Sequence, residues 1–432
     1  MLAASRCTRR GMSEGNSDID DTQECSSAGC NGDNVRLGAV QPLYTLSAHG
    51  DLLMNLARMY VSSSALYAVA ISLSLMLSMP ASATSAPFKH PGAIALDHAG
   101  HLWVANQDYF GITEIQASTG KVIRLINAKA DGFIDPSGIA ISGNNVWVVS
   151  GSVTYENGTS NYGMVTELNA TTGDLVRTVN LKKHGVTGLS GASADAAHVW
   201  VSADGGEQVA ELSNATGKVV HVYRGRQKFV QPSGIATDGR HVWIPSLESG
   251  EGMVERSAVT GAEIRTITPL VKEVPPEGGI EDPIYLMPRF VTVDAHYVWT
   301  GNEQGTSFKQ LGSVTQIDAA TGKIVRTIGT AVDRFFGNIQ SIVSDGTHVW
   351  VVNGSVYTRG GRRGDSVTEL NASNGSLVRV VLLRNGIYSD PVGLVSNGVD
   401  VWVTDQGGGT DGIGSVMELN ASTGTVVRVI GH

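Results

Sequence analysis

Seven residues stand at equivalent places in this 432-residue chain, directly before a proline or a branched aliphatic residue, and five of them carry side chains able to bind ions or move protons. The seven residues are His90, Asp135, Gly188, Gln231, Met287, Asn338 and Asp390. Carboxylate and carboxamide oxygens are hard ligands for Mg²⁺ or Ca²⁺, and His and Asp also serve in acid–base catalysis. Two residues further on stand Gly92, Ser137, Ser190, Ser233, Arg289, Gln340 and Val392. Arg289 and Gln340 depart from the small-residue pattern and would suit an anion.

These side chains can act together only if the fold gathers them at one place. The ligand-binding set would then be His90, Asp135, Gln231, Arg289, Asn338, Gln340 and Asp390. Within it, Asp135, Asp390 and Asn338 are the candidate metal ligands, and His90, Asp135 and Asp390 the candidate catalytic residues if the protein is an enzyme. The alternative is that all of these groups cap strand ends and bind water.

A long internal repeat supplies the elements that would position them. The seven tryptophans, Trp103, Trp147, Trp200, Trp243, Trp299, Trp350 and Trp402, are separated by 44, 53, 43, 56, 51 and 52 residues. Each period holds four short runs rich in Val, Ile and Thr, as in SGIAT, HVWIP, VTELN and VVRTI, separated by Gly, Asn and Asp turns. Such runs without helical periodicity predict β-strands. Four strands in each period of 43–56 residues predict an all-β, seven-bladed β-propeller over 87–432, with four antiparallel strands per blade.

An acidic residue in the third strand is followed ten positions later by a basic one in the fourth. The pairs are Glu114/Arg124, Glu167/Arg177, Glu255/Arg265, Glu369/Arg379 and Glu418/Arg428, with Glu211/His221 and Gln316/Arg326 as variants. A fixed offset across a tight turn predicts cross-strand neighbours. These residues are therefore predicted to be structural, as are the tryptophans, which we expect to pack between blades.

The connections between strands follow two different rules. Turns between the first and second strands, and between the third and fourth, are short and repetitive, as in DGRH and NASTG. The other connections are long and different in each period, for example 150–163 and 269–290. In a propeller the two kinds of connection lie on opposite faces, and variable loops on a rigid scaffold usually carry binding. We therefore expect the function on the face where the seven positions lie.

The N-terminal part of the chain has a different composition. Residues 1–53 are predicted to be a disordered extension, with a misassigned translation start as the alternative. Residues 54–86 are predicted to be a signal peptide or, if uncleaved, a membrane anchor, because an apolar run there ends in an Ala-x-Ala pattern. The prediction is a secreted or extracytoplasmic protein, at the cell surface or in the periplasm. A net charge of −9 argues against nucleic-acid binding. We expect a monomer that meets the membrane only if the apolar segment is retained.

The repeat PSGIATDGRHVWIPS followed by VTELNASTG resembles the bacterial exported YVTN/NHL-like propellers related to the streptogramin (virginiamycin B) lyases. The resemblance implies the propeller fold and, for an enzyme, a Mg²⁺-dependent carbon–oxygen lyase acting on a cyclic lactone-like substrate. The chain has no G-x-S-x-G, H-E-x-x-H or phosphate-binding glycine loop. The leading hypothesis is a scaffold that binds a small molecule, glycan or protein through its variable face; a lyase with bound Mg²⁺ or Ca²⁺ is the alternative.

Overall fold

The computed structural model describes residues 87–107, 111–127, 133, 135–151, 163–225, 230–247, 252–268, 287–302, 312–329, 335–354, 356–358, 361–363, 365–383, 390–407 and 413–431. The N-terminal segments 1–53 and 54–86 lie outside these residues, so their assignment as an extension and a signal peptide stays a prediction. Within the described ranges, no helix has both the length and the apolar character needed to cross a bilayer.

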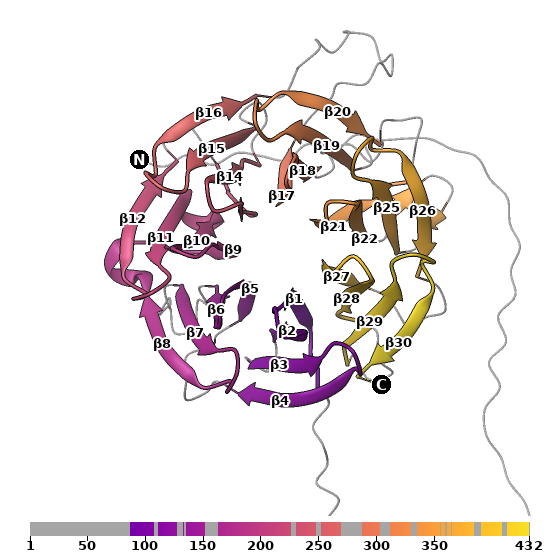
Figure 1. Ribbon diagram of the computed structural model, residues 1–432, viewed down its shortest axis with the longest axis horizontal. Helices are drawn as coiled ribbons and strands as arrows, with labels where there is room; N and C mark the ends of the chain where they lie inside the picture. The colour runs from indigo at the N-terminus through magenta and orange to yellow at the C-terminus, as the bar shows by residue number, and fades with distance from the viewer. Residues whose placement is uncertain are drawn as a thin grey trace, which may run out of the picture. The chain divides into compact units, whose positions relative to one another are not determined.

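The described strands form seven four-stranded antiparallel sheets around a common axis, which confirms the predicted propeller (Figure 1). Blade 1 contains β1 (Pro91–Leu96), β2 (His101–Asn106), β3 (Gly111–Gln116) and β4 (Lys121–Asn127). Blade 2 contains β5 (Pro136–Ser142), β6 (Asn145–Ser150), β7 (Met164–Asn169) and β8 (Leu175–Asn180). Blade 3 contains β9 (Leu189–Ala194), β10 (His198–Ala203), β11 (Gln208–Ser213) and β12 (Val219–Arg224), with short 3-10 turns η1 (Leu181–His184) and η2 (Asp204–Gly206).

The second half of the ring repeats this order. Blade 4 contains β13 (Ala236–Thr237), β14 (His241–Pro245), β15 (Met253–Ser257) and β16 (Glu263–Ile267). Blade 5 contains β17 (Pro288–Val293), β18 (Tyr297–Asn302), β19 (Ser313–Asp318) and β20 (Ile324–Ile328). Blade 6 contains β21 (Asn338–Ser344), β22 (His348–Gly354), β25 (Ser366–Asn371) and β26 (Leu377–Leu382), with the hairpin β23 (Val356–Thr358) and β24 (Gly361–Arg363) inserted after β22. Blade 7 contains β27 (Pro391–Ser396), β28 (Asp400–Asp405), β29 (Ser415–Asn420) and β30 (Val426–Ile430).

The first strand of each blade lies nearest the axis and packs against the first strands of both neighbouring blades, so the ring is closed (Figure 1). All four strands of blade 1 are consecutive in the sequence, as are those of blade 7. The seam between them is therefore held by side chains and packing rather than by an exchanged strand.

Packing between blades involves the tryptophans, as predicted. All seven are buried, with at most 1% of their surface exposed. Trp103 of blade 1 packs with Val146 and Val148 of blade 2, and Trp402 of blade 7 packs with Leu102 of blade 1. The second strands are apolar at consecutive positions because neighbouring blades cover both faces of each sheet.

The predicted acid–base pairs lie opposite one another on the third and fourth strands. Glu114 faces Arg124 in the register of β3 and β4, and Arg124 Nε lies 2.6 Å from Glu114 Oε2. The same pairing recurs at 2.6–2.9 Å for the other four Glu/Arg pairs. The arginine also reaches the next blade, since Arg124 Nη2 donates to the carbonyl of Thr171 at 3.1 Å. It therefore fastens two strands and two blades, which goes beyond the cross-strand pairing predicted from the sequence.

Blade 3 departs from this pattern. Glu211 and His221 are opposite one another in the register, as predicted. The hydrogen bond to the buried carboxylate, however, comes from Tyr223, whose hydroxyl donates to Glu211 Oε2 at 2.7 Å. The guanidinium of Arg256 in blade 4 lies 4.2 Å from the centre of the Tyr223 ring. Tyr223 and Arg256 together replace the arginine that the other blades use.

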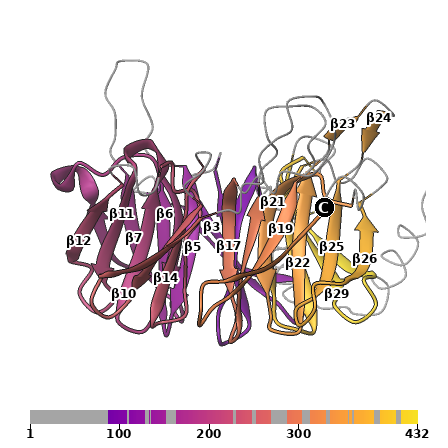
Figure 2. The same ribbon diagram turned by 90° about the horizontal axis from the view of Figure 1, so that it is seen from above.

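The two kinds of connection leave from opposite rims of the ring. The short turns lie at the end where β1 passes into β2, which we call the constant rim. At the other end, which we call the variable rim, β2 passes into β3 and β4 passes into the next blade. The inserted β23–β24 hairpin also lies there (Figure 2). The start of the innermost strand pairs with the end of the second strand in every blade except blade 4, as Pro91 does with Asn106. The seven positions singled out in the sequence therefore lie on the variable rim.

Candidate binding site at the variable rim

We call the seven residues singled out in the sequence the mouth residues: His90, Asp135, Gly188, Gln231, Met287, Asn338 and Asp390. Six of them lie directly before the innermost strand of their blade or at its first position, whereas Gln231 lies five residues before β13. The structure places them at equivalent points around the axis. His90, Gln231 and Asp390 are exposed, whereas Asp135 and Asn338 are half-buried. The predicted order of neighbours is also found, since blades 6, 7, 1 and 2 follow one another through β21, β27, β1 and β5.

Four consecutive mouth residues have a left-handed backbone. The φ angles are +46° at His90, +51° at Asp135, +66° at Gly188 and +47° at Gln231. For residues other than glycine this conformation costs about 1–2 kcal/mol. His90, Asp135 and Gln231 also precede a proline, a context that favours extended backbone. His90, Asp135 and Gln231 are therefore polar residues at three positions where glycine would adopt the same left-handed backbone without strain.

Glycine at the fourth of these places has its own steric cause. A Cβ on Gly188 would lie 2.7 Å from backbone atoms of Gly205 in η2. The close approach of η2 thus requires glycine in blade 3, whereas blades 1, 2 and 4 have room for a side chain.

The backbone on both sides of the mouth residues is held by hydrogen bonds from the second strand. The carbonyls of His90, Asp135 and Asp390 accept hydrogen bonds from the first amide after that strand, at 2.9–3.2 Å. On the N-terminal side, buried polar side chains at or near the ends of the second strands accept amide protons. Asn106 Oδ1 accepts from Lys89 N, Ser246 Oγ from Val230 N, and Asn353 Oδ1 from Gly337 N. The left-handed residues are therefore fixed in place.

The small residues two positions further on join neighbouring blades. Ser137 Oγ donates to the carbonyl of Leu189, Ser190 Oγ to that of Pro232, and Ser233 Oγ to that of Arg289, at 2.9–3.1 Å. These serines are therefore structural. The amide of Gln340, in contrast, lies near the end of β22. A Cβ added to Gly354, the last residue of β22, would lie 3.2 Å from Gln340 Nε2. The guanidinium of Arg289 lies 5.5 Å from the ring centre of Phe290.

Two further polar side chains at this rim were not identified from the sequence. Gln107 and Gln406 are the first residues after β2 and β28, and their backbone amides donate to His90 and Asp390. Gln406 Nε2 donates to Gln107 Oε1 at 3.0 Å, across the seam between blades 7 and 1. The repeat gives no signal for them because they open the connections that vary from blade to blade. A search of the residue directly after each second strand would have found them.

The metal site stays a prediction. Within the part of the chain that the structure describes, no three His, Cys, Asp or Glu residues gather closely enough to hold a metal ion. Asp135, Asp390 and Asn338 lie at the expected rim, on three different blades.

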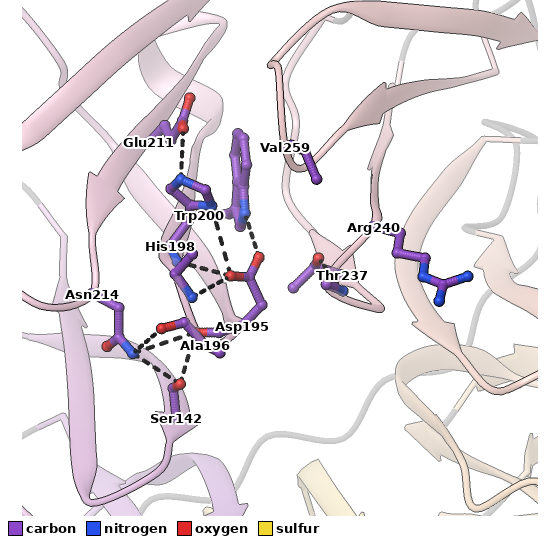
Figure 3. A network of polar contacts seen from close by, with 12 residues as sticks. Ser142, Asp195, Ala196, His198, Trp200, Glu211, Asn214, Thr237, Arg240 and Val259 are labelled. Carbon is purple, nitrogen blue, oxygen red and sulfur yellow. Dashed lines mark hydrogen bonds and ion pairs between the residues drawn. The ribbon is translucent and has the colours of Figure 1, made fainter.

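A second class of polar cluster lies at the constant rim. His198 opens β10 between Asp195, 3.7 Å from its Nδ1, and Glu211, 3.4 Å from its Nε2 (Figure 3). Asp195 also accepts a hydrogen bond from Trp200 Nε1 at 3.2 Å. His101, His241 and His348 occupy the same setting in three other blades. Because the cluster recurs in four blades and joins the turn, the tryptophan and the third strand of each of them, its role is structural.

Burial has a clear electrostatic effect on these clusters. Removal from water raises the pKa of Glu114, Glu255 and Glu369, and the neighbouring arginine and histidine only partly offset it. Asp345 behaves in the opposite way. Burial raises its pKa, but hydrogen bonds from His348 N, Thr347 N and Ser396 together lower it below its usual value.

Comparisons with known proteins support the fold and nothing finer. No protein-family model and no curated protein matches the chain. Similar solved structures include BamB from Moraxella catarrhalis (16% identity, 75% of this chain and 81% of that chain covered, TM-score 0.44). Hydrazine synthase from Kuenenia stuttgartiensis has 15% identity over 80% of each chain, with a TM-score of 0.45. A streptogramin B lyase structure has 15% identity over 74% of this chain and 91% of that chain, with a TM-score of 0.52. The predicted likeness to the streptogramin lyase group is thereby confirmed at the level of the fold.

Proposed function

We propose that this propeller is an exported binding scaffold that holds a small molecule, glycan or protein at its mouth residues and performs no chemistry of its own. The observation that carries the proposal is the left-handed backbone at His90, Asp135 and Gln231. Strained backbone positions cluster where side chains serve recognition or catalysis.

The surroundings of these residues also support binding. The carbonyls of His90 and Asp135 accept hydrogen bonds from the first amides after β2 and β6, so a ligand would meet residues whose backbone is already fixed. Binding to such a site avoids part of the entropy cost of ordering the residues that make the contacts.

The lyase alternative rests on the types of the same side chains. An imidazole at His90 and carboxylates at Asp135 and Asp390 could move a proton in an elimination. The reaction that the resemblance implies also needs a divalent cation, which Asp135, Asp390 and Asn338 would have to hold together.

A thermal-shift screen with matched variants tests the proposal. The full-length protein would be screened against sugars, short peptides, organic acids and divalent cations, since a ligand raises the melting temperature by mass action. Any shift should be lost in His90→Ala or Asp135→Ala and kept in His98→Ala. His98 is the matched control, because it lies in the same blade, exposed, on the constant rim. A ligand whose shift depends on His98 and not on the mouth residues would contradict the proposal.

The same assay separates the scaffold from the lyase. Mg²⁺ and Ca²⁺ would be tested with and without a chelator, and no shift at millimolar metal would weigh heavily against the lyase. Metal-dependent breakdown of a streptogramin-like lactone that disappears in His90→Ala would replace the scaffold proposal.

A further inference from the structure

The paired carboxamides of Gln107 and Gln406 form a built polar element at the seam between blades 7 and 1. Each side chain is half-buried, and each residue is anchored through its backbone amide to a mouth residue. Gly92 lies beside the pair, since a Cβ there would lie 3.5 Å from Gln107 Nε2, an ordinary contact distance. The two amides lie head to tail, with Gln406 Nε2 donating to Gln107 Oε1 at 3.0 Å.

This arrangement leaves a donor and an acceptor side by side. A carboxamide carries two N–H donors and a carbonyl with two lone pairs. After the bond between them, Gln107 keeps both its N–H groups, and Gln406 keeps its carbonyl and one N–H. In the described part of the chain this is the only side-chain hydrogen bond of the pair. The element therefore suits a partner that accepts at one atom and donates at the next.

The neighbouring side chains extend the same chemistry. Asn338 and Gln340 in blade 6 add two more carboxamides, and the exposed Asp390 in blade 7 adds an acceptor. The four carboxamides carry no charge, and they can bond neighbouring hydroxyl groups, each of which donates and accepts at once.

We propose that the mouth binds a glycan, with Gln107 and Gln406 bridging two adjacent hydroxyls of one sugar ring and Asn338, Gln340 and Asp390 contacting the next sugar. This inference rests on the proposed binding function and names its ligand class. A peptide would present the same donor and acceptor groups but also side chains. Around the pair, Gly92 has no side chain and the buried Thr404 donates from Oγ1 to the Gly92 carbonyl at 2.7 Å, which favours a ligand that bonds through polar groups.

Isothermal titration of the full-length protein with neutral oligosaccharides tests the assignment. The probes are chitotetraose, cellotetraose, maltotetraose and mannotetraose, with the blocked tripeptide acetyl-trialanine amide as the competing class. Gln107→Met and Gln406→Met keep the length of the side chain and remove the amide. Gln116→Met is the matched control, because Gln116 lies in blade 1 at the constant rim, where it donates to the carbonyl of Gly100.

The expected result is that at least one oligosaccharide binds the wild type. Gln107→Met and Gln406→Met should each weaken binding roughly tenfold, the effect of losing two ordinary hydrogen bonds. Gln116→Met should leave the affinity unchanged. Equal affinity for the wild type and Gln406→Met would overturn the inference. Binding of the tripeptide and of no sugar would also overturn it while leaving the proposed binding function intact. Failure of the proposed function shows separately, in the comparison of His90→Ala with His98→Ala.

Discussion

Arg428 in the last strand of the ring donates from Nη2 to the backbone carbonyl of Ser118 in the first blade, at 3.1 Å. The same bond joins internal blades, from Arg265 to Ala320 and from Arg379 to Ser422. The seam that closes the ring is thus built like the seams within it. Because the same outer hairpin recurs in each blade, the last blade bonds to the first as any blade bonds to the next, and the ring closes. This explains why the sequences of the third and fourth strands repeat so strictly.

Removing this arginine should loosen the seam. Arg428→Ala would break the bond to Ser118 and leave Glu418, which is 4% exposed, without its cation. We expect a loss of about 1–3 kcal/mol, since one partner of a largely buried pair is left behind and the arginine is partly solvated. Urea unfolding, monitored by tryptophan fluorescence, measures this loss of unfolding free energy. Arg379→Ala at an internal seam is the matched control and should cost a similar amount; an unchanged midpoint in Arg428→Ala would contradict this account of closure.

Mild acid should stabilise the ring through its buried glutamates. Burial raises the pKa of Glu418, and Arg428 only partly offsets this. Glu418 therefore holds its proton more tightly in the folded protein than in the unfolded chain, where the pKa of a glutamate is about 4.3. The resulting stabilisation is full below that value and is lost as pH rises through the folded pKa.

Glu418→Gln isolates this effect, and blade 5 already carries Gln316 at the equivalent position. The variant should gain stability relative to the wild type as pH is raised from about 4 to 7, in urea unfolding at several pH values. A variant that loses relative stability over that range would show that the ion pair outweighs burial.

Tyr223 should ionise unusually late. Burial raises its pKa well above the ordinary value, with further contributions from the hydrogen bond to Glu211 and from its charge. Ultraviolet titration of the folded protein should therefore show a tyrosine that stays protonated after the exposed ones have ionised, and Tyr223→Phe should remove that signal. The variant should also lose about 1 kcal/mol of stability, the ordinary effect of deleting one hydrogen bond. An unchanged titration in Tyr223→Phe would contradict the assignment.

The scaffold could be predicted from the sequence because its strand pattern, its tryptophan and its short turns recur from blade to blade. The tryptophans, the facing Glu114 and Arg124, and the two rims all follow from strand periodicity and fixed offsets. Tyr223 could not be predicted, since it reaches Glu211 from two positions beyond the expected partner His221. The left-handed backbone of Gln231 was equally hidden, because a proline after it favours a different conformation. Gln107 and Gln406 lie where repetition ends, so only three-dimensional packing shows that they meet.

The stability of Gln231→Gly tests most directly whether the mouth side chains are kept for binding rather than for folding. Gln231 is exposed, and in the described residues its side chain makes no hydrogen bond, so glycine removes no hydrogen bond and relieves the left-handed backbone. We predict that the free energy of unfolding rises by up to about 1 kcal/mol, once the greater freedom of glycine in the unfolded chain is included. A clear fall in that free energy would mean that the Gln231 side chain serves the fold, and would contradict the proposed site.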